Sequence, residues 1–189
     1  NRNEAVSEPF EIEAYTKFTF PGRQGKYSKF IWDHQCFTGV DYAHNLGENA
    51  VYSIQNEYGE GWEEVLDTEK GNYDYLMFCD IEFRNPAVRE ELKRFLKWFF
   101  KQIPFDGMRL DAVKHIAPAF LTEFLDYARS LKPDLFAVGE YWAPGDLPLL
   151  LKCLEAVGDR MWLFDASLHH NFFDASKRGN EYDLRTIFR

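Results

Sequence analysis

Residues 105–141 read FDGMRLDAVKHIAPAFLTEFLDYARSLKPDLFAVGEY, a segment in which two short apolar runs flank a helical pattern. The runs at 105–111 and 135–141 predict strands, because both are short, apolar and bounded by polar or Pro-containing stretches. Between them, Pro118 opens a stretch whose apolar residues recur with the 3.6-residue period of a helix. A strand, a helix and a second strand in this order predict a βα unit with parallel strands.

The same alternation continues on both sides of this unit. Asn85 and Pro86 predict the start of a preceding helix, since Asn caps helices and Pro favours the first helical position. Asp146 is expected to cap a third helix, and residues 161–168 are expected to form a third strand. The fold class is therefore α/β with a parallel sheet, either a doubly wound open sheet or part of a (β/α)8 barrel. No GxGxxG or GxxxxGK(S/T) loop follows a predicted strand, which argues against the commonest nucleotide-binding folds.

Residues 1–83 differ from the rest of the chain in composition. They are rich in aromatic residues, Gly and short polar breaks, and they show no long helical period. Residues 10–20 alternate apolar and polar side chains, which predicts a half-buried strand, and residues 21–28 supply Pro and Gly for a turn. We interpret this part as an irregular β-rich module with long loops.

The charge of the chain excludes some classes of partner. Its formal net charge is -9 and it has no long basic run, which argues against binding to nucleic acid or to an anionic membrane surface. No apolar stretch is long enough to span a bilayer, and the first residues lack the apolar core of a signal peptide. Aromatic residues make up 17% of the chain, as in sugar-binding surfaces and also in barrel cores. The three widely spaced cysteines are expected to be buried free thiols.

Asp111 and Glu140 are the strongest candidates for catalytic residues. Each ends a predicted strand, and their spacing is close to one βα repeat of about 30 residues. The two carboxyl groups are therefore expected on neighbouring strands at the same mouth of the sheet, where such folds bind ligands. Two facing acids suit glycoside hydrolysis, although acids at strand ends also serve metal-dependent chemistry and helix capping. Arg109 faces the same side as Asp111 and favours its ionised form, and Asp165 is a further candidate acid by position.

Longer motifs give a resemblance to a known family. FDGMRLDAVKH (105–115) together with VGEYW (138–142) resembles two motifs of the α-amylase family, glycoside hydrolase family 13. TFPGR (19–23), GNYDYLMFCDIEF (71–83) and LFDASLHHNF (163–172) resemble liquefying-type bacterial α-amylases in the same order. The resemblance covers essentially the whole chain. It implies an inserted, irregular, β-rich domain B in residues 1–83 and part of a (β/α)8 TIM barrel in residues 84–189.

The resemblance also implies a reaction and its catalytic residues. Asp111 matches the nucleophile that forms a covalent glycosyl intermediate, and Glu140 matches the general acid/base. Arg109 matches the arginine beside the nucleophile. The implied function is the hydrolysis of α-1,4-glucosidic bonds in starch- or glycogen-type glucans by double displacement, and Asp165 is not the third catalytic acid in this comparison. The alternatives are another family 13 activity (α-glucosidase or glucanotransferase), an inactive glucan-binding fragment, or unrelated metal-dependent chemistry.

Three further residues match substrate-binding positions of the family. Lys114 and His115 match residues that hold sugar on the leaving-group side, and Trp142 would offer an indole face near the cleft. Without the resemblance, Lys114 would be read as a solvated cation and Trp142 as a packing residue at the rim. The expected partner is an α-glucan polysaccharide or oligosaccharide.

A calcium ion is the cofactor that the resemblance implies. Asp74 and Asp80 match its carboxylate ligands, and the backbone carbonyl of His115 matches another, a set of hard oxygen ligands of the kind that Ca²⁺ prefers. Some liquefying amylases carry an additional metal cluster built from several aspartates. Thr38, Glu82 and Arg84 stand where three of those acids would be, so this additional cluster is not expected here.

The remaining family motifs are expected outside this chain. The first motif, which gives a calcium ligand and a substrate histidine, is expected before residue 1, and the third catalytic acid beyond Arg189. Three parallel strands alone would leave unpaired edges and uncovered apolar faces. We therefore expect that the chain does not fold or work alone, and that the remainder of the same polypeptide or partner copies complete it. The sequence does not distinguish a secreted from a cytoplasmic protein.

Overall fold

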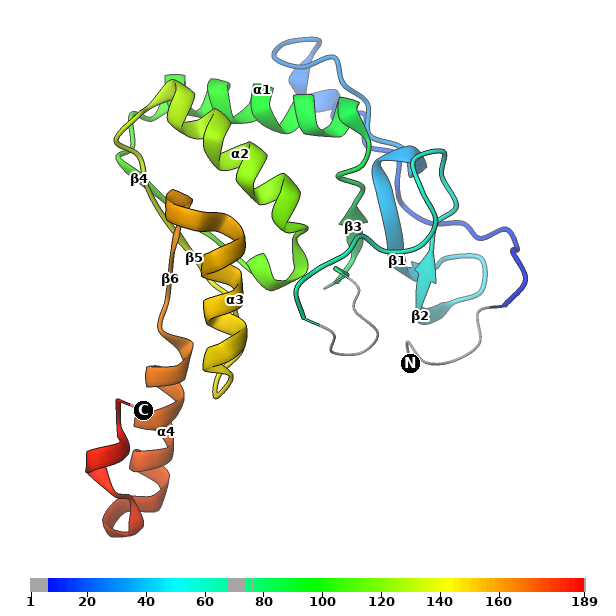
Figure 1. Cartoon of the computed structure of the whole chain (residues 1–189). Helices are drawn as coiled ribbons and strands as arrows, with labels where there is room; N and C mark the ends of the chain where they lie inside the picture. The colour runs from blue at the N-terminus through cyan, green and yellow to red at the C-terminus, as the bar shows by residue number, and fades with distance from the viewer. Residues whose placement is uncertain (1–6, 68–73, 76, 189) are drawn as a thin grey trace. The chain divides into compact units, whose positions relative to one another are not determined.

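The computed structural model describes residues 7–67, 74–75 and 77–188 of the chain (Figure 1). The chain divides into two compact units, residues 1–99 and 100–189, each of which is described by itself. Residues 71–73 and Leu76, which belong to one of the segments that resemble α-amylases, lie outside the described residues. The division between the two units falls inside a helix, α1. The boundary between a domain B and a barrel at residues 83 and 84 stays a prediction.

The first unit is built on a small antiparallel sheet (Figure 1). Its strands pair in the order β2-β1-β3, and β1 bends at two register shifts, one toward each neighbour. The elements are η1 (Pro21–Arg23), η2 (His34–Cys36), β1 (Phe37–Ala43), β2 (Glu48–Ser53) and β3 (Cys79–Ile81). The core cluster beside the sheet contains Cys36, Phe37 and Val88. The small sheet, the register shifts in β1 and the long connections agree with the interpretation of this part of the chain as an irregular β-rich module.

The prediction of a strand over residues 10–20 is wrong. This segment forms only one isolated bridge, in which Phe18 N donates to Trp32 O at 3.0 Å. A strand needs a neighbour along its length, and aromatic packing takes the place of a ladder here. Phe18 packs edge-on against Tyr15 and Phe37, with ring centroids 5.0 and 6.0 Å away. The alternation of apolar and polar residues in this segment therefore reflects which side chains are shielded, and it does not indicate pairing with another strand.

Helix α1 (Pro86–Gln102) begins where the sequence predicts it. The Asn85 side chain accepts a hydrogen bond from Ala87 N at 2.9 Å, which satisfies one of the free N–H groups of the first turn. Asn85 also donates to the Gln35 carbonyl at 3.0 Å. The helix cap is therefore tied to the turn that precedes β1.

The second unit consists of three parallel βα repeats (Figure 1). Its strands pair in the order β4-β5-β6, with Arg109 opposite Val138 and Leu110 opposite Gly139. The strands are β4 (Gly107–Leu110), β5 (Phe136–Gly139) and β6 (Trp162–Leu163). The helices are α2 (Pro118–Leu131), α3 (Leu147–Val157) and α4 (Ala166–Arg178), with short turns η4 (Val113–His115), η5 (Gly158–Arg160), η6 (Gly179–Glu181) and η7 (Leu184–Thr186). The predicted order of strands and helices is confirmed, and so is the Asp146 cap, which accepts from Leu149 N.

The predicted strand over residues 161–168 is too long. Strand β6 covers only Trp162–Leu163, and α4 begins at Ala166. The reason is Asp165, whose side chain accepts a hydrogen bond from Leu168 N at 2.8 Å and so starts the helix. In this unit Asp165 is a helix cap rather than a third acid.

Some apolar side chains of this sheet remain exposed, among them Phe136 and Trp162. Parallel sheets normally have both faces covered by other elements. Of the three free cysteines, Cys36 and Cys153 are buried and Cys79 is half-buried. Within the described residues, no helix has the length and hydropathy needed to cross a membrane.

Candidate active site

The ends of β4 and β5 carry the two predicted catalytic carboxyl groups. Hydrogen bonding continues past the strands, because Glu140 N donates to Leu110 O at 2.8 Å and Val113 N donates to Glu140 O at 3.0 Å. Between these bonds Ala112 adopts a left-handed conformation (φ 49°), which turns the chain into η4 directly after Asp111. The backbone thus holds Asp111 and Glu140 side by side at the C-terminal edge of the sheet.

Arg109 joins the two carboxyl groups. Its Nη2 lies 2.7 Å from Asp111 Oδ1 and 3.2 Å from Glu140 Oε2. Because one nitrogen contacts both oxygens, the two oxygens lie no further apart than the sum of these two distances. The Glu140 carboxylate also accepts from Ala112 N at 3.4 Å. The three side chains that the sequence proposed as catalytic are therefore brought together.

The two carboxyl groups differ in their surroundings. The Asp111 side chain is 74% exposed, whereas that of Glu140 is 29% exposed. Asp111 therefore projects from the sheet edge, and Glu140 is set back beside the backbone of the β4–η4 turn. One exposed and one shielded carboxyl group are compatible with different roles in one reaction.

Phe164 belongs to the same edge, and sequence reasoning gave it no role. Phe164 follows β6, and its N donates to Gly139 O at 3.1 Å, which fixes it beside β5. The Arg109 guanidinium lies over its ring, with Cζ 5.7 Å from the centroid. Its position at the end of a predicted strand could have indicated a role at this site, but a single Phe at such a position is more often a packing residue.

The predicted substrate-binding residues lie near these carboxyl groups in the chain. Lys114 and His115 form η4, the turn that follows Asp111, and both are half-buried. Trp142 lies two residues after Glu140, is exposed, and has its ring centroid 5.7 Å from that of His169. These positions are compatible with the sugar-binding roles, which remain predictions.

In the first unit, two of the predicted calcium ligands are acids, of which Asp74 is buried and Asp80 is half-buried. Neither carboxylate oxygen of Asp74 accepts a hydrogen bond from a donor among the described residues. Burial and the nearby Asp80 carboxyl group raise the pKa of the Asp74 carboxyl. Burial also raises the pKa of Asp80, although Thr38 Oγ1 donates to it. Such a pair fits a cation, which would relieve both the burial and the repulsion.

Asp74 and Asp80 do not by themselves make a complete metal site. Among the described residues, no group of three or more His, Cys, Asp or Glu side chains has the arrangement of a metal site. His115, whose carbonyl is the third predicted ligand, belongs to the other compact unit. Asp74 and Asp80 are therefore candidate ligands rather than a complete site.

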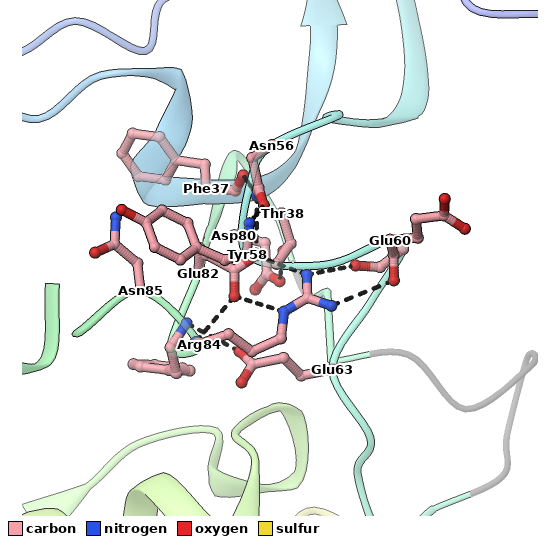
Figure 2. A network of polar contacts seen from close by, with 12 residues as sticks. Phe37, Thr38, Asn56, Tyr58, Glu60, Glu63, Asp80, Glu82, Arg84 and Asn85 are labelled. Atoms are coloured by element: carbon pink, nitrogen blue, oxygen red, sulfur yellow. Dashed lines mark hydrogen bonds and ion pairs between the residues drawn. The ribbon is translucent and has the colours of Figure 1, made fainter. Parts of the chain in front are cut away.

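Close to these acids, Arg84 forms a buried ion pair with Glu82 (Figure 2). The pair is bidentate, with Nε 2.7 Å from Oε1 and Nη2 2.6 Å from Oε2. Arg84 also donates to the carbonyls of Glu60 (3.2 Å) and Gly61 (2.9 Å). A Cβ at Gly59 would lie 2.3 Å from Arg84 Nη1, so only Gly leaves room for the guanidinium. Arg84 thus supplies a cation from the protein itself.

The acids around Arg84 respond to it differently. Burial would raise the pKa of Glu82, but hydrogen bonds from Arg84 and Asn56 outweigh it, and the pKa lies below its usual value. Burial raises the pKa of Glu63 to about 7, and the hydrogen bond from Phe83 N at 3.0 Å offsets this effect only in part. Glu82 is therefore the acid that Arg84 neutralises directly.

Comparison with known proteins gives relatives along the whole chain. No family model matches the chain. It is 43% identical over 190 residues to the cytoplasmic α-amylase of Escherichia coli (strain K12), covering 100% of this chain and 38% of that protein. It is 43% identical over 189 residues to an α-amylase of Geobacillus stearothermophilus, covering 99% and 34%. A crystal structure of a cyclomaltodextrin glucanotransferase with a three-domain ABC distribution shares 25% identity, with a TM-score of 0.51 over 57% of this chain and 22% of that chain.

A parallel α/β sheet with Asp, Glu and Arg gathered at its C-terminal edge is the arrangement of barrel-type glycoside hydrolases. The chain belongs to the α-amylase family, glycoside hydrolase family 13, and corresponds to a central portion of its relatives. It spans about a third of the length of the curated relatives it matches. Its two small sheets are accordingly a partial α/β fragment of a family whose members have TIM barrels.

Proposed function

We propose that the polypeptide containing this chain hydrolyses α-1,4-glucosidic bonds in starch- or glycogen-type glucans with retention of configuration. The observation that carries this proposal is the contact of Arg109 Nη2 with both Asp111 and Glu140. In the proposed reaction, Asp111 attacks the anomeric carbon and Glu140 protonates the leaving oxygen. Glu140 then takes a proton from the water that releases the sugar from Asp111.

The geometry favours retention over inversion. Inverting glycosidases need roughly 6.5–9.5 Å between their carboxyl groups to admit a water molecule, and retaining enzymes need about 5–5.5 Å. Arg109 Nη2 lies 2.7 Å from Asp111 Oδ1 and 3.2 Å from Glu140 Oε2, so these two oxygens are closer together than the separation that inversion requires.

The proposed architecture follows from the family. Residues 1–83 would be domain B and residues 84–189 part of the (β/α)8 catalytic barrel. The remainder of the same polypeptide would supply the other strands and helices, and the exposed Phe136 and Trp162 side chains support this. Lys114 and His115 would bind the glucan on the leaving-group side of the scissile bond, and Trp142 would offer its indole face to the glucan near the cleft.

Calcium is the proposed cofactor. Asp74, Asp80 and the backbone carbonyl of His115 would hold it, and the orphaned Asp74 oxygens support the first two. A bound calcium ion would supply positive charge between these two acids. Its contribution would be structural, since the proposed chemistry rests on Asp111 and Glu140.

A second candidate is another activity of the same family. Likeness to a cyclomaltodextrin glucanotransferase favours transfer of the glycosyl unit to a sugar hydroxyl in place of water. An α-glucosidase would share Asp111 and Glu140 as well. Product analysis on starch, maltooligosaccharides and maltose separates these activities, and an inactive glucan-binding fragment would bind starch without forming products.

The test uses the full-length polypeptide with the variants Asp111→Asn and Glu140→Gln. Removal of the general acid should lower kcat by about 10²–10⁴-fold, and removal of the nucleophile should abolish turnover. Asp106→Asn is the matched control, because Asp106 lies at the opposite end of β4, is exposed and pairs with Lys132. A fluorinated glucosyl substrate should label Asp111, and NMR should show the α-anomer as first product. The proposal fails if the first product is the β-anomer or if Asp111→Asn retains wild-type activity.

A further inference from the structure

Three contacts connect the segment after β6 with the active-site edge. We call this segment, residues 164–170, the β6–α4 junction. Phe164 lies under the Arg109 guanidinium, and His169 packs beside Trp142 with ring centroids 5.7 Å apart at an angle of 54°. At Gly145, a Cβ would lie 3.4 Å from His170 Cδ2, so the backbone of the loop after Glu140 lies against this imidazole. The junction therefore touches Arg109 of β4 and the segment that follows β5.

The contact with Phe164 restricts the position of the Arg109 side chain. An Arg side chain has many rotamers, and holding it in one geometry costs conformational entropy of up to about 2 kcal/mol. Arg109 is half-exposed and reaches both carboxylates through the single nitrogen Nη2. A ring on another side of the guanidinium restricts its positions and adds a cation–π attraction. Phe164 can restrict the guanidinium because its own backbone N–H donates a hydrogen bond to Gly139 O.

The contact with His169 restricts the orientation of the Trp142 indole. The Trp142 side chain is 52% exposed, so burial in a core does not hold its ring. The imidazole of His169, in the first turn of α4, lies beside the indole in a tilted arrangement. Asp165 fixes that turn as the helix cap. The orientation of the indole is therefore tied to the start of α4.

We propose that the β6–α4 junction positions the active-site edge, with Phe164 as a positioning residue for Arg109 and His169 as a positioning residue for Trp142. This inference rests on the proposed function, since it concerns the same carboxyl groups and the same glucan. Neither residue touches the reacting atoms. Phe164 acts on the chemical step through Arg109, and His169 acts on glucan binding through Trp142.

The first experiment measures kcat and KM of Phe164→Leu in the full-length polypeptide on a maltooligosaccharide. We expect kcat to fall about two- to fivefold, the size of a cation–π contact at an exposed site, with KM unchanged. Phe164→Tyr keeps the ring and should restore kcat. The matched control is Phe173→Leu, because Phe173 holds Lys177 at 5.4 Å and is 51% exposed, against 47% for Phe164.

A double-mutant cycle separates positioning from a general loss of structure. In an Arg109→Met background, Phe164→Leu should have no further effect on kcat, because Met carries no cation for the ring to attract and orient. The inference is overturned if Phe164→Leu matches Phe173→Leu, or if its effect is unchanged in the Arg109→Met background. Failure of the proposed function is a distinct result, in which the wild-type polypeptide forms no product from any α-glucan.

The second experiment applies the same design to His169. His169→Ala should raise KM for the maltooligosaccharide with kcat unchanged, and His169→Phe, which keeps an aromatic ring, should restore KM. In a Trp142→Ala background, His169→Ala should have no further effect. A rise in KM that persists in the Trp142→Ala background would refute the role of His169.

Discussion

Replacing Arg84 with Met tests the buried ion pair of the first unit. Met keeps an apolar stem of similar length but removes the guanidinium from Glu82, which is fully buried. Loss of one partner of a buried ion pair destabilises a protein by about 3–5 kcal/mol, because the other charge stays buried and unpaired. Asn56 would still donate to Glu82 at 2.9 Å, which places the expected cost near the lower end of that range.

Arg94→Met is the matched control for this substitution. Arg94 also forms a bidentate pair with an acid, at 2.6 Å from both oxygens of Glu91. Arg94 is half-exposed, however, and Glu91 keeps a hydrogen bond from Ser28 Oγ at 2.9 Å. Glu91 is also buried, but Arg94 is 39% exposed against 26% for Arg84, so we expect a smaller loss than for Arg84→Met.

Urea unfolding of the full-length polypeptide in EDTA at neutral pH measures both losses. The pKa of Glu82 is lowered in the folded state, so the stability it contributes is present above its ordinary value of 4.5 and is lost as the pH falls through the lower folded value. The difference between wild type and Arg84→Met should therefore shrink below pH 4.5. The double variant Glu82→Gln/Arg84→Met should recover most of the loss at neutral pH. Equal losses in Arg84→Met and Arg94→Met, or a difference independent of pH, would refute the reasoning.

Three further predictions concern the same unit. Asp74→Asn should abolish stabilisation by added calcium, and wild-type calcium affinity measured by calorimetry should increase with pH, because Asp74 has a raised pKa and must lose its proton to bind the ion. Burial raises the pKa of Glu63 from 4.5 to about 7, so wild-type stability in EDTA should fall more steeply than that of Glu63→Gln as the pH rises through this range, in which the raised pKa of Asp74 lowers the stability of both proteins. Gly39→Ala should lower the free energy of unfolding by about 1–3 kcal/mol, since its Cβ would lie 2.1 Å from Trp62 Cη2. A wild-type stability in Gly39→Ala would show that Trp62 moves freely.

Local rules predicted the starts of helices better than the extents of strands. Pro118, the Asn85 cap and the Asp146 cap start helices through contacts within one or two turns, so sequence patterns found them. The expected strand over 10–20 failed because strand formation depends on a neighbour distant in sequence. The third strand was predicted too long because Asp165 at its end caps α4 instead of extending the sheet.

The sequence by itself determined that Asp111 and Glu140 end neighbouring parallel strands, because strand, helix and cap signals are local and the βα repeat has a nearly fixed length. Motif likeness also pointed to the family to which the chain belongs. Only the tertiary structure decided that one nitrogen of Arg109 contacts both carboxylates and that Phe164 lies under the guanidinium. It alone showed that Arg84 pairs with buried Glu82 in the space left by Gly59. These contacts depend on side-chain rotamers and on segments far apart in the chain, which no local pattern specifies.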